Sequence, residues 1–135
     1  MPVDRIQHTW PAFFPPDCPP ADAEAVKREV YRFVINDPPA AADFVPLIQL
    51  RDDIWPSKLC EAAGLSVFTD LVDAARQRRR FKGFRRRKVA RGIIQPEHGV
   101  SKSTPRDSFL SHVTWWLADG VAAETLFAVV SEIVP

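Results

Sequence analysis

The sequence contains little cysteine, glycine and histidine, and each shortage excludes a class of site. Two cysteines in 135 residues are too few for a disulfide scaffold. Five scattered glycines form no glycine-rich loop that could cradle a phosphate, which argues against Walker and dinucleotide-binding folds. The three histidines lack the spacing of metal ligands on a helix, and no CxxC or HExxH motif occurs, so we expect no metal site.

Long hydrophobic runs are also missing. No stretch approaches the ~18 apolar residues of a membrane span. The beginning of the chain is interrupted by prolines and lacks the apolar core of a signal peptide. We therefore expect a cytoplasmic protein with no membrane span, in which Cys18 and Cys60 are both reduced. A single bridge between the two cysteines is the alternative that the sequence leaves open.

Length and composition predict one domain with its own hydrophobic core. The chain has 135 residues, of which 46% are hydrophobic, and most of its thirteen prolines lie in the first 46 positions. Residues 1–25 are predicted to form an extended, proline-rich arm. Because Trp10, Phe13 and Phe14 would gain little on a solvated tail, we expect this arm to pack on the domain. Residues 26–135 are then a single α+β domain.

Four segments are rich in β-branched and aromatic residues, which favours strands. They are residues 29–35, 65–68, 88–94 and 111–117. Residues 100–104 are expected to form a hairpin with the 88–94 strand after an intervening turn. The predicted fold class is therefore α+β, with a small and mostly antiparallel sheet.

Two or three helices complete the prediction. Asp37 and Pro38 suit the cap and the first position of a short helix that follows them. Thr69 is expected to cap a second helix that runs into a cluster of arginines. Residues 121–134 carry apolar side chains at helical spacing and predict an amphipathic closing helix. A shorter helical turn is expected to end at Gly64.

Negative charge is absent from one long stretch, and this is the strongest signal in the sequence. No Asp or Glu occurs between Asp73 and Glu97, although the whole chain has 17 acidic and 18 basic residues. Ten of the basic residues fall in the sixteen positions 76–91, which we call the Arg-rich segment: Arg76, Arg78, Arg79, Arg80, Lys82, Arg85, Arg86, Arg87, Lys88 and Arg91. The other eight face all seventeen acidic residues, a balance of −9, so positive potential is concentrated in one place.

A segment of this kind suits an anionic partner. Arginine presents a planar fork of donors that pairs with phosphate oxygens and stays charged at any relevant pH. Phe81 and Phe84 lie among the charges, and aromatic rings beside arginine suit single-stranded nucleic acid. We therefore predict a small binding protein that engages nucleic acid, another polyanion or an acidic protein surface. The alternatives are an anionic membrane surface, or the chain's own acidic residues with both phenylalanines as core anchors.

Two histidines are candidates for chemistry. Glu97 and His98 stand together in a predicted turn, where an acid and an imidazole could transfer a proton. His112 opens the last predicted strand, and alternation places it on one face with Thr114 and Trp116, where the three could line a ligand cleft. The alternatives are an exposed turn for His98 and an ordinary packed strand for His112.

The chain resembles a family of small bacterial proteins. The motifs that carry the resemblance are CPPADAE (18–24), VYR (30–32), NDPP with Asp43 and Phe44 (36–44), GLSVFTDLVDA (64–74), PEHGV (96–100), STP (103–105) and SHVTWW (111–116). These motifs cover most of the length. The resemblance implies a bacterial protein and brings no assigned activity with it.

The order of elements also resembles that of ADP-ribosyltransferase-like folds. In those folds a strand carrying Tyr-Arg is followed by a helix, a Ser-containing strand and a second helix. The resemblance implies that Arg32 would hold NAD, with Ser66 and His112 around the nicotinamide ring. It also implies a catalytic acid, which neither Glu97 nor Glu124 matches. Such an enzyme, or a degenerate relative that binds NAD, is the alternative function.

Overall fold

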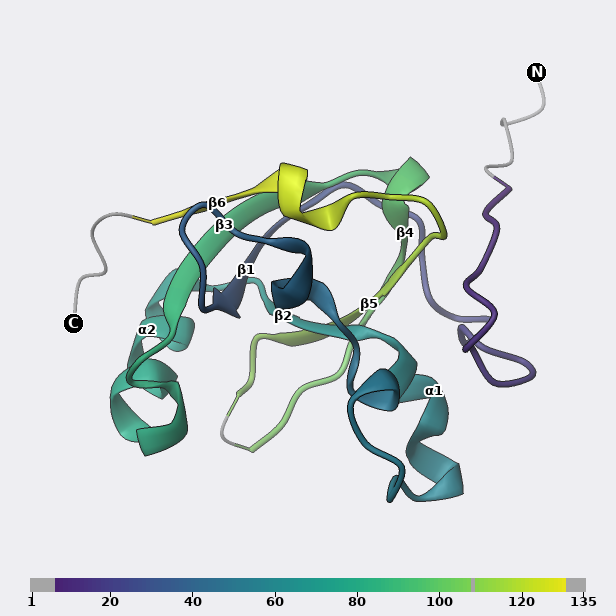
Figure 1. The fold of residues 1–135 in the computed structure, drawn as a ribbon, viewed down its shortest axis with the longest axis horizontal. Coiled ribbons are helices and arrows are strands. Elements are labelled where there is room, and N and C mark those ends of the chain that lie inside the picture. Colours follow the sequence, from purple (N-terminus) through teal and green to yellow (C-terminus); the bar gives the residue numbers. More distant parts are fainter. Residues whose placement is uncertain (1–6, 108, 131–135) are drawn as a thin grey trace.

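A six-stranded sheet forms the centre of the protein (Figure 1). The computed structural model describes residues 7–107 and 109–130. The strands are β1 (Arg28–Val34), β2 (Leu65–Phe68), β3 (Lys88–Ile94), β4 (Gly99–Ser103), β5 (His112–Leu117) and β6 (Phe127–Val129). They lie in the order β4-β5-β2-β1-β3-β6, and all neighbouring pairs are antiparallel. With the helices α1 (Leu59–Ala63) and α2 (Leu71–Arg80), this confirms the predicted α+β class.

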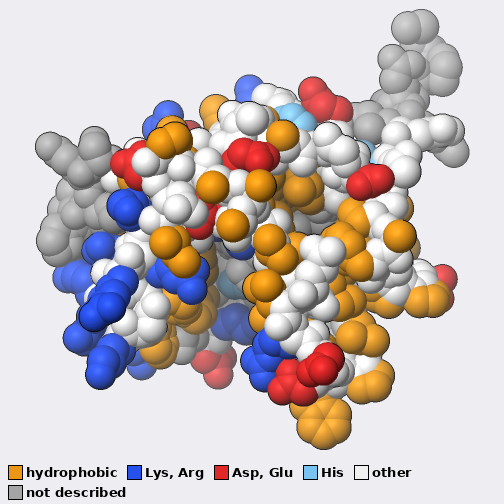
Figure 2. Space-filling model, viewed as in Figure 1, with side chains coloured by type: hydrophobic (Ala, Val, Ile, Leu, Met, Phe, Trp, Pro, Cys, Tyr) orange, Lys and Arg blue, Asp and Glu red, His pale blue; other side chains and the backbone are white. Residues whose placement is uncertain are grey.

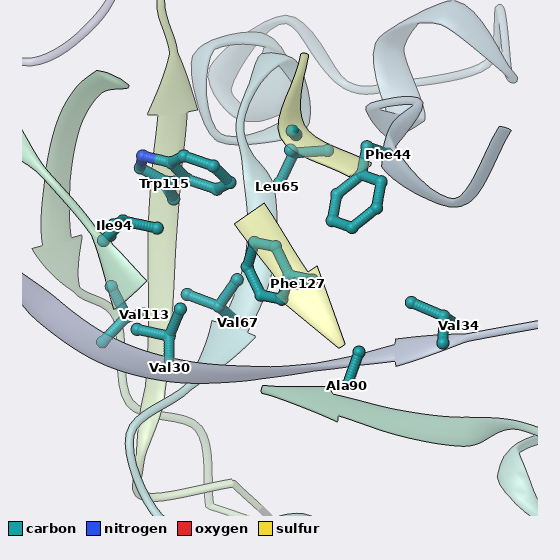
Figure 3. Close-up of a cluster of buried hydrophobic side chains, with 11 residues drawn as sticks. Val30, Val34, Phe44, Leu65, Val67, Ala90, Ile94, Val113, Trp115 and Phe127 are labelled. Carbon is teal, nitrogen blue, oxygen red and sulfur yellow. The ribbon is translucent and has the colours of Figure 1, made fainter. Parts of the chain in front are cut away.

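Side-chain alternation gives the sheet two packed faces. The larger core lies on one face, where Phe127 of β6 contacts both Trp115 of β5 and Phe44 of the 3-10 turn η1 (Ala41–Phe44) (Figure 3). A smaller cluster on the other face joins Tyr31 and Phe68 to α2. Full burial of a large apolar side chain contributes about 1.5–3 kcal/mol, so these two clusters hold the strands together. β5 is buried along almost its whole length, which places its polar residues inside the protein.

The Arg-rich segment begins within helix α2. The side chain of Asp70 accepts a hydrogen bond from the backbone N–H of Val72 at 2.9 Å, so Asp70 is the cap and the predicted cap, Thr69, is wrong. Ala74 is buried in the smaller cluster and fixes α2 on the sheet. The last turn of α2 carries three arginines, whose charges suit the negative end of the helix dipole.

The described part of the N-terminal arm, residues 7–25, runs along the domain (Figure 1). The backbone of Glu24 exchanges two hydrogen bonds, of 2.9 and 2.8 Å, with the backbone of Ser101 in β4. Nearer the start of the arm, the carbonyl oxygen of Thr9 accepts a 2.7 Å hydrogen bond from the backbone N–H of Asp119. Because β4 is an edge strand, the arm covers part of an edge that would otherwise be open.

Cys18 in the arm and Cys60 in α1 are joined by a disulfide, so the prediction of two reduced cysteines is wrong. The two Cα atoms are 5.5 Å apart although 42 positions separate them in the chain. The carbonyl of Cys60 also accepts a 2.7 Å hydrogen bond from the indole N–H of Trp116. The path of the arm brings the cysteines together, and sequence spacing does not encode that path.

The closing helix predicted over residues 121–134 is also wrong. Residues 123–126 form the 3-10 turn η6 (Ala123–Leu126), and β6 follows it. β6 pairs with β3, with Phe127 opposite Gly92. The edge of β3 offers backbone partners and a place for the Phe127 ring over Gly92, and both outweigh the helical spacing of the apolar residues. Residues 131–134 of the predicted helix lie outside the described part.

Two further local predictions fail for reasons of pairing and side-chain bonding. β4 pairs with β5 rather than forming the predicted hairpin with β3, because β1 and β6 already occupy both sides of β3. The short helix predicted after Asp37 and Pro38 is replaced by η1 and η2 (Leu47–Gln49), with Pro46 between them. Burial raises the pKa of Asp43, yet three hydrogen bonds to its carboxylate outweigh burial and lower it. They come from Ala40, Ile35 and Asn36.

Candidate functional site

The Arg-rich segment lies along one side of the molecule. It runs from the last turns of α2 through η4 (Lys82–Phe84) and into β3. Eight of its ten cationic side chains are exposed, and those of Arg78 and Arg87 are half-buried. Figure 2 shows Lys and Arg side chains gathered on the left of the molecule, where Figure 1 places α2.

The charges of this segment are not matched by carboxylates in the described part of the chain. The ion pairs there are Arg51–Asp53, Lys102–Asp22 and Arg106–Glu61, and none includes a residue of the segment. The segment's side-chain hydrogen bonds go to neutral backbone carbonyls. They are Arg78 to Arg87, Arg85 to Arg79, and Lys88 to Ile35. These contacts order the segment and leave its positive potential in place.

Phe81 and Phe84 anchor the segment to the domain. Phe84 stacks on Phe33 of β1, with ring centroids 4.7 Å apart, and Phe81 stacks on Phe109 at 5.6 Å. Both phenylalanines are half-buried by these contacts. One face of each ring is therefore covered within the protein, and an anion would meet the guanidinium groups around them.

A cleft of about 930 Å³ opens beside this anchored segment. Figure 2 shows the surface hollowed between the basic side chains and a group of hydrophobic ones. The walls are mostly apolar and include Phe33, Phe68, Phe84, Phe109 and Leu47. Arg87 belongs both to the cleft and to the Arg-rich segment, so the two candidate sites are neighbours.

His112 and Ser66 face each other in the cleft. Residue 112 opens β5 and residue 66 lies in the adjacent β2, so strand pairing brings them close. The Nε2 atom of His112 is 3.0 Å from the Oγ of Ser66. On the other side of the ring, Nδ1 lies 3.0 Å from the carbonyl oxygen of Thr104 and 2.8 Å from its Oγ1. His112 is buried, and Ser66 is exposed toward the cleft.

Arg32 reaches the cleft where β1 and β2 diverge, since these strands are paired only at Tyr31 and Phe68. Its Nη1 donates to the carbonyl of Ser66 at 2.7 Å, and its Nε donates to the carbonyl of Asp43 at 2.9 Å. Burial lowers the pKa of Arg32 to about 10, and the charge of Arg87 lowers it as well while that of Asp43 raises it. Arg32 therefore stays cationic at neutral pH.

Charged groups of both signs line the cleft, with a surplus of positive ones. The cations are Arg32, Lys58, Arg87 and Arg106, and the acids are Glu61 and Asp107. Glu61 is paired with Arg106, which also donates to the carbonyl of Thr104 at 3.3 Å. The surplus favours a ligand, or a reaction intermediate, that carries negative charge.

Three of the four catalytic candidates from the sequence meet in this cleft: Arg32, Ser66 and His112. His98 does not line it; it ends the turn η5 (Pro96–His98), where its Nδ1 accepts a 2.9 Å hydrogen bond from the backbone N–H of Gln95. Sequence reasoning missed Thr104 and Arg106. Thr104 ends the predicted 100–104 strand and Arg106 follows it in a polar stretch, and neither position specifies a partner.

Comparisons with family models, curated proteins and solved structures found no match to this chain. The two sites and their chemistry are therefore the basis for a function. In the part of the chain that the structure describes, no helix has the length and apolarity to cross a bilayer.

Proposed function

We propose that the protein binds nucleic acid through phosphate contacts made by the Arg-rich segment. The observation that carries the proposal is eight exposed cations on one ordered segment, with no carboxylate partner among residues 7–107 and 109–130. A phosphate backbone supplies the missing negative charge in a regular row. Cations placed along it release condensed counterions, which drives binding at low salt.

The composition of the segment favours phosphate over other anions. Eight of its ten cations are arginines, whose guanidinium groups pair with two phosphate oxygens at once. Because Phe81 and Phe84 are stacked on other rings of the protein, base stacking is not the proposed contact. Binding should therefore depend on charge more than on sequence.

A variant with four exposed cations replaced tests this proposal: Arg76→Gln, Arg79→Gln, Lys82→Gln and Arg86→Gln. Each lost phosphate contact reduces the slope of log affinity against log salt by about 0.7–0.9, so the slope should fall by about three. Fluorescence anisotropy with labelled single-stranded RNA and duplex DNA measures it. These side chains are exposed, so the fold should be unchanged by circular dichroism.

The matched control removes four cations from other places: Lys27→Gln, Arg51→Gln, Lys58→Gln and Lys102→Gln. Its net charge equals that of the test variant, and its salt slope should stay close to that of the unmodified protein. Equal slopes for the two variants would show that only total charge matters. Competition by polyglutamate as strong as that by RNA would point instead to an acidic protein surface.

NAD binding in the cleft is the second candidate function, favoured by the meeting of Arg32, Ser66 and His112. NAD is the one cofactor that this alternative requires. Calorimetry should give heat on titration with NAD, and a concentration of about 100 times Kd should stabilise the fold by about 2.7 kcal/mol. Ser66→Ala should weaken both effects, whereas Ser57→Ala, outside the cleft, should not. Absence of heat and of thermal protection removes this candidate.

Cellular location stays a prediction. The sequence favours the cytoplasm, and the disulfide favours an oxidising compartment, where such bonds persist. The two locations differ in the thiol state of Cys18 and Cys60 inside the cell, which alkylation before lysis measures directly.

A further inference from the structure

We propose that Ser66 is the nucleophile of an ester-hydrolysing site, with His112 as its general base and Thr104 as a positioning residue. This inference depends on neither of the functions above. It rests on three groups that contact one another in turn. They are a hydroxyl open to the cleft, an imidazole 3.0 Å from it, and a threonine on the far side of the ring. Serine hydroxyls are activated by this arrangement, in which a base contacts the nucleophile and a third group orients the base.

Thr104 determines which ring nitrogen of His112 carries the proton. Its carbonyl oxygen can only accept a hydrogen bond, and it lies 3.0 Å from Nδ1, so Nδ1 bears the hydrogen. Nε2 is then the unprotonated nitrogen, and its lone pair points at the hydroxyl of Ser66 at 3.0 Å. The Thr104 hydroxyl also lies 2.9 Å from Thr114 Oγ1, which holds the threonine in place. Ser66 therefore donates its proton to His112.

The surroundings of His112 keep it neutral and able to act as a base. Burial lowers its pKa from the ordinary value of 6.5, and the charge of Arg106 lowers it further, while the hydrogen bond with Thr104 raises it. The other charged groups that face the cleft are Arg32 from β1, Lys58 just before α1, Glu61 within α1, Arg87 after η4, and Asp107. At neutral pH the imidazole is therefore uncharged.

The cleft indicates the class of substrate. Its volume of about 930 Å³ and its phenylalanine and leucine walls suit an ester with an apolar acyl chain. The positive surplus of the lining favours the negative oxygen that develops when a carbonyl is attacked. Arg106, whose charge lowers the pKa of His112, also lines the cleft.

The reaction proceeds in two balanced steps. Ser66 Oγ forms a bond to the ester carbonyl carbon as its proton passes to His112 Nε2, and the bond from that carbon to the alcohol oxygen breaks as the alcohol takes the proton. Water then attacks the acyl-serine, again giving a proton to His112, and the acid leaves as Ser66 recovers it. The net reaction consumes one water and produces a carboxylic acid and an alcohol.

An alkyl fluorophosphonate tests the proposal, since it reacts with an activated serine by forming an oxygen–phosphorus bond and releasing fluoride. Mass spectrometry of the full chain should find one adduct, on Ser66. Ser66→Ala should abolish it, and Ser57→Ala, an exposed serine outside the cleft, should leave its rate unchanged. His112→Gln should slow labelling at least about 100-fold, the usual contribution of a general base.

The pH dependence of labelling tests the role of His112 as the base even if His112→Gln fails to fold. With His112 as base, the labelling rate is constant above the ordinary histidine pKa of about 6.5 and falls only at lower pH, where the imidazole takes up a proton. A serine with no base reacts faster at every step toward alkaline pH. No adduct on Ser66, an adduct that survives in Ser66→Ala, or a rate that keeps rising with pH would overturn the proposal.

Discussion

Replacing Cys60 with alanine is expected to lower the free energy of unfolding by about 4 kcal/mol, because the disulfide closes a loop of 42 positions and restricts the unfolded chain. The bond also holds the N-terminal arm against α1, whose residues Glu61 and Ala62 line the cleft. Urea unfolding followed by tryptophan fluorescence measures the change. Treatment of the unmodified protein with a thiol reductant should reproduce it.

The three cysteine variants supply an internal control for this prediction. Cys18→Ala should lower stability as much as Cys60→Ala, and the double variant should be no less stable than either single variant, since all three remove one bond. Additive losses would show that the side chains matter as separate packing groups. A reductant that leaves the unfolding midpoint unchanged would contradict the prediction directly.

Replacing Gly99 with alanine is expected to destabilise the protein by about 2–6 kcal/mol, the sum of backbone strain of about 1–3 kcal/mol and overpacking of about 1–3 kcal/mol. Gly99 begins β4 with φ 146°, a backbone conformation that L side chains rarely adopt. A Cβ atom there would lie 2.0 Å from the carbonyl oxygen of Trp116 in the paired strand. Because a backbone atom is the obstacle, no side-chain rotation relieves the clash, and β4 must separate from β5 at this end.

Two other glycines separate the causes of that loss. Gly120 also has a positive φ, of 83°, but has open space around it, so Gly120→Ala should show strain alone, about 1–2 kcal/mol. Gly83 has open space and no such φ, so Gly83→Ala should change stability by less than about 1 kcal/mol. The same urea unfolding measures all three. A loss in Gly99→Ala no larger than in Gly120→Ala would remove the clash as its cause.

Local patterns predicted much of the sheet, and their failures have a common origin. The strands around Tyr31, Val67, Ala90 and Val113 were predicted within one residue or so, because alternation and β-branched composition are properties of neighbouring positions. The C-terminal segment around Phe127 has helical spacing but forms a strand, because β3 offers an edge that no local pattern reveals. Pairing partners depend on the whole sheet order, so β4 was assigned to the wrong neighbour.

In the candidate cleft, too, single residues could be predicted from local patterns, and contacts between distant residues could not. Arg32, Ser66 and His112 were singled out one at a time, from resemblance and from strand position. Their meeting could not be deduced, since the hydrogen bond between Ser66 and His112 joins positions 46 apart. Thr104, which fixes the tautomer of His112, stood only in a motif of the resemblance and at the end of a predicted strand, and neither pattern reveals its contact with a histidine eight positions away.

By itself, the sequence determined the α+β class, the places of the central strands and a block of positive charge with no acidic neighbours along the chain, because each of these is a property of adjacent residues. The tertiary structure alone decided the Cys18–Cys60 disulfide, the strand order and the meeting of Ser66 with His112. Those features depend on how distant segments close upon one another, and burial on both faces of the sheet, rather than local preference, sets that arrangement.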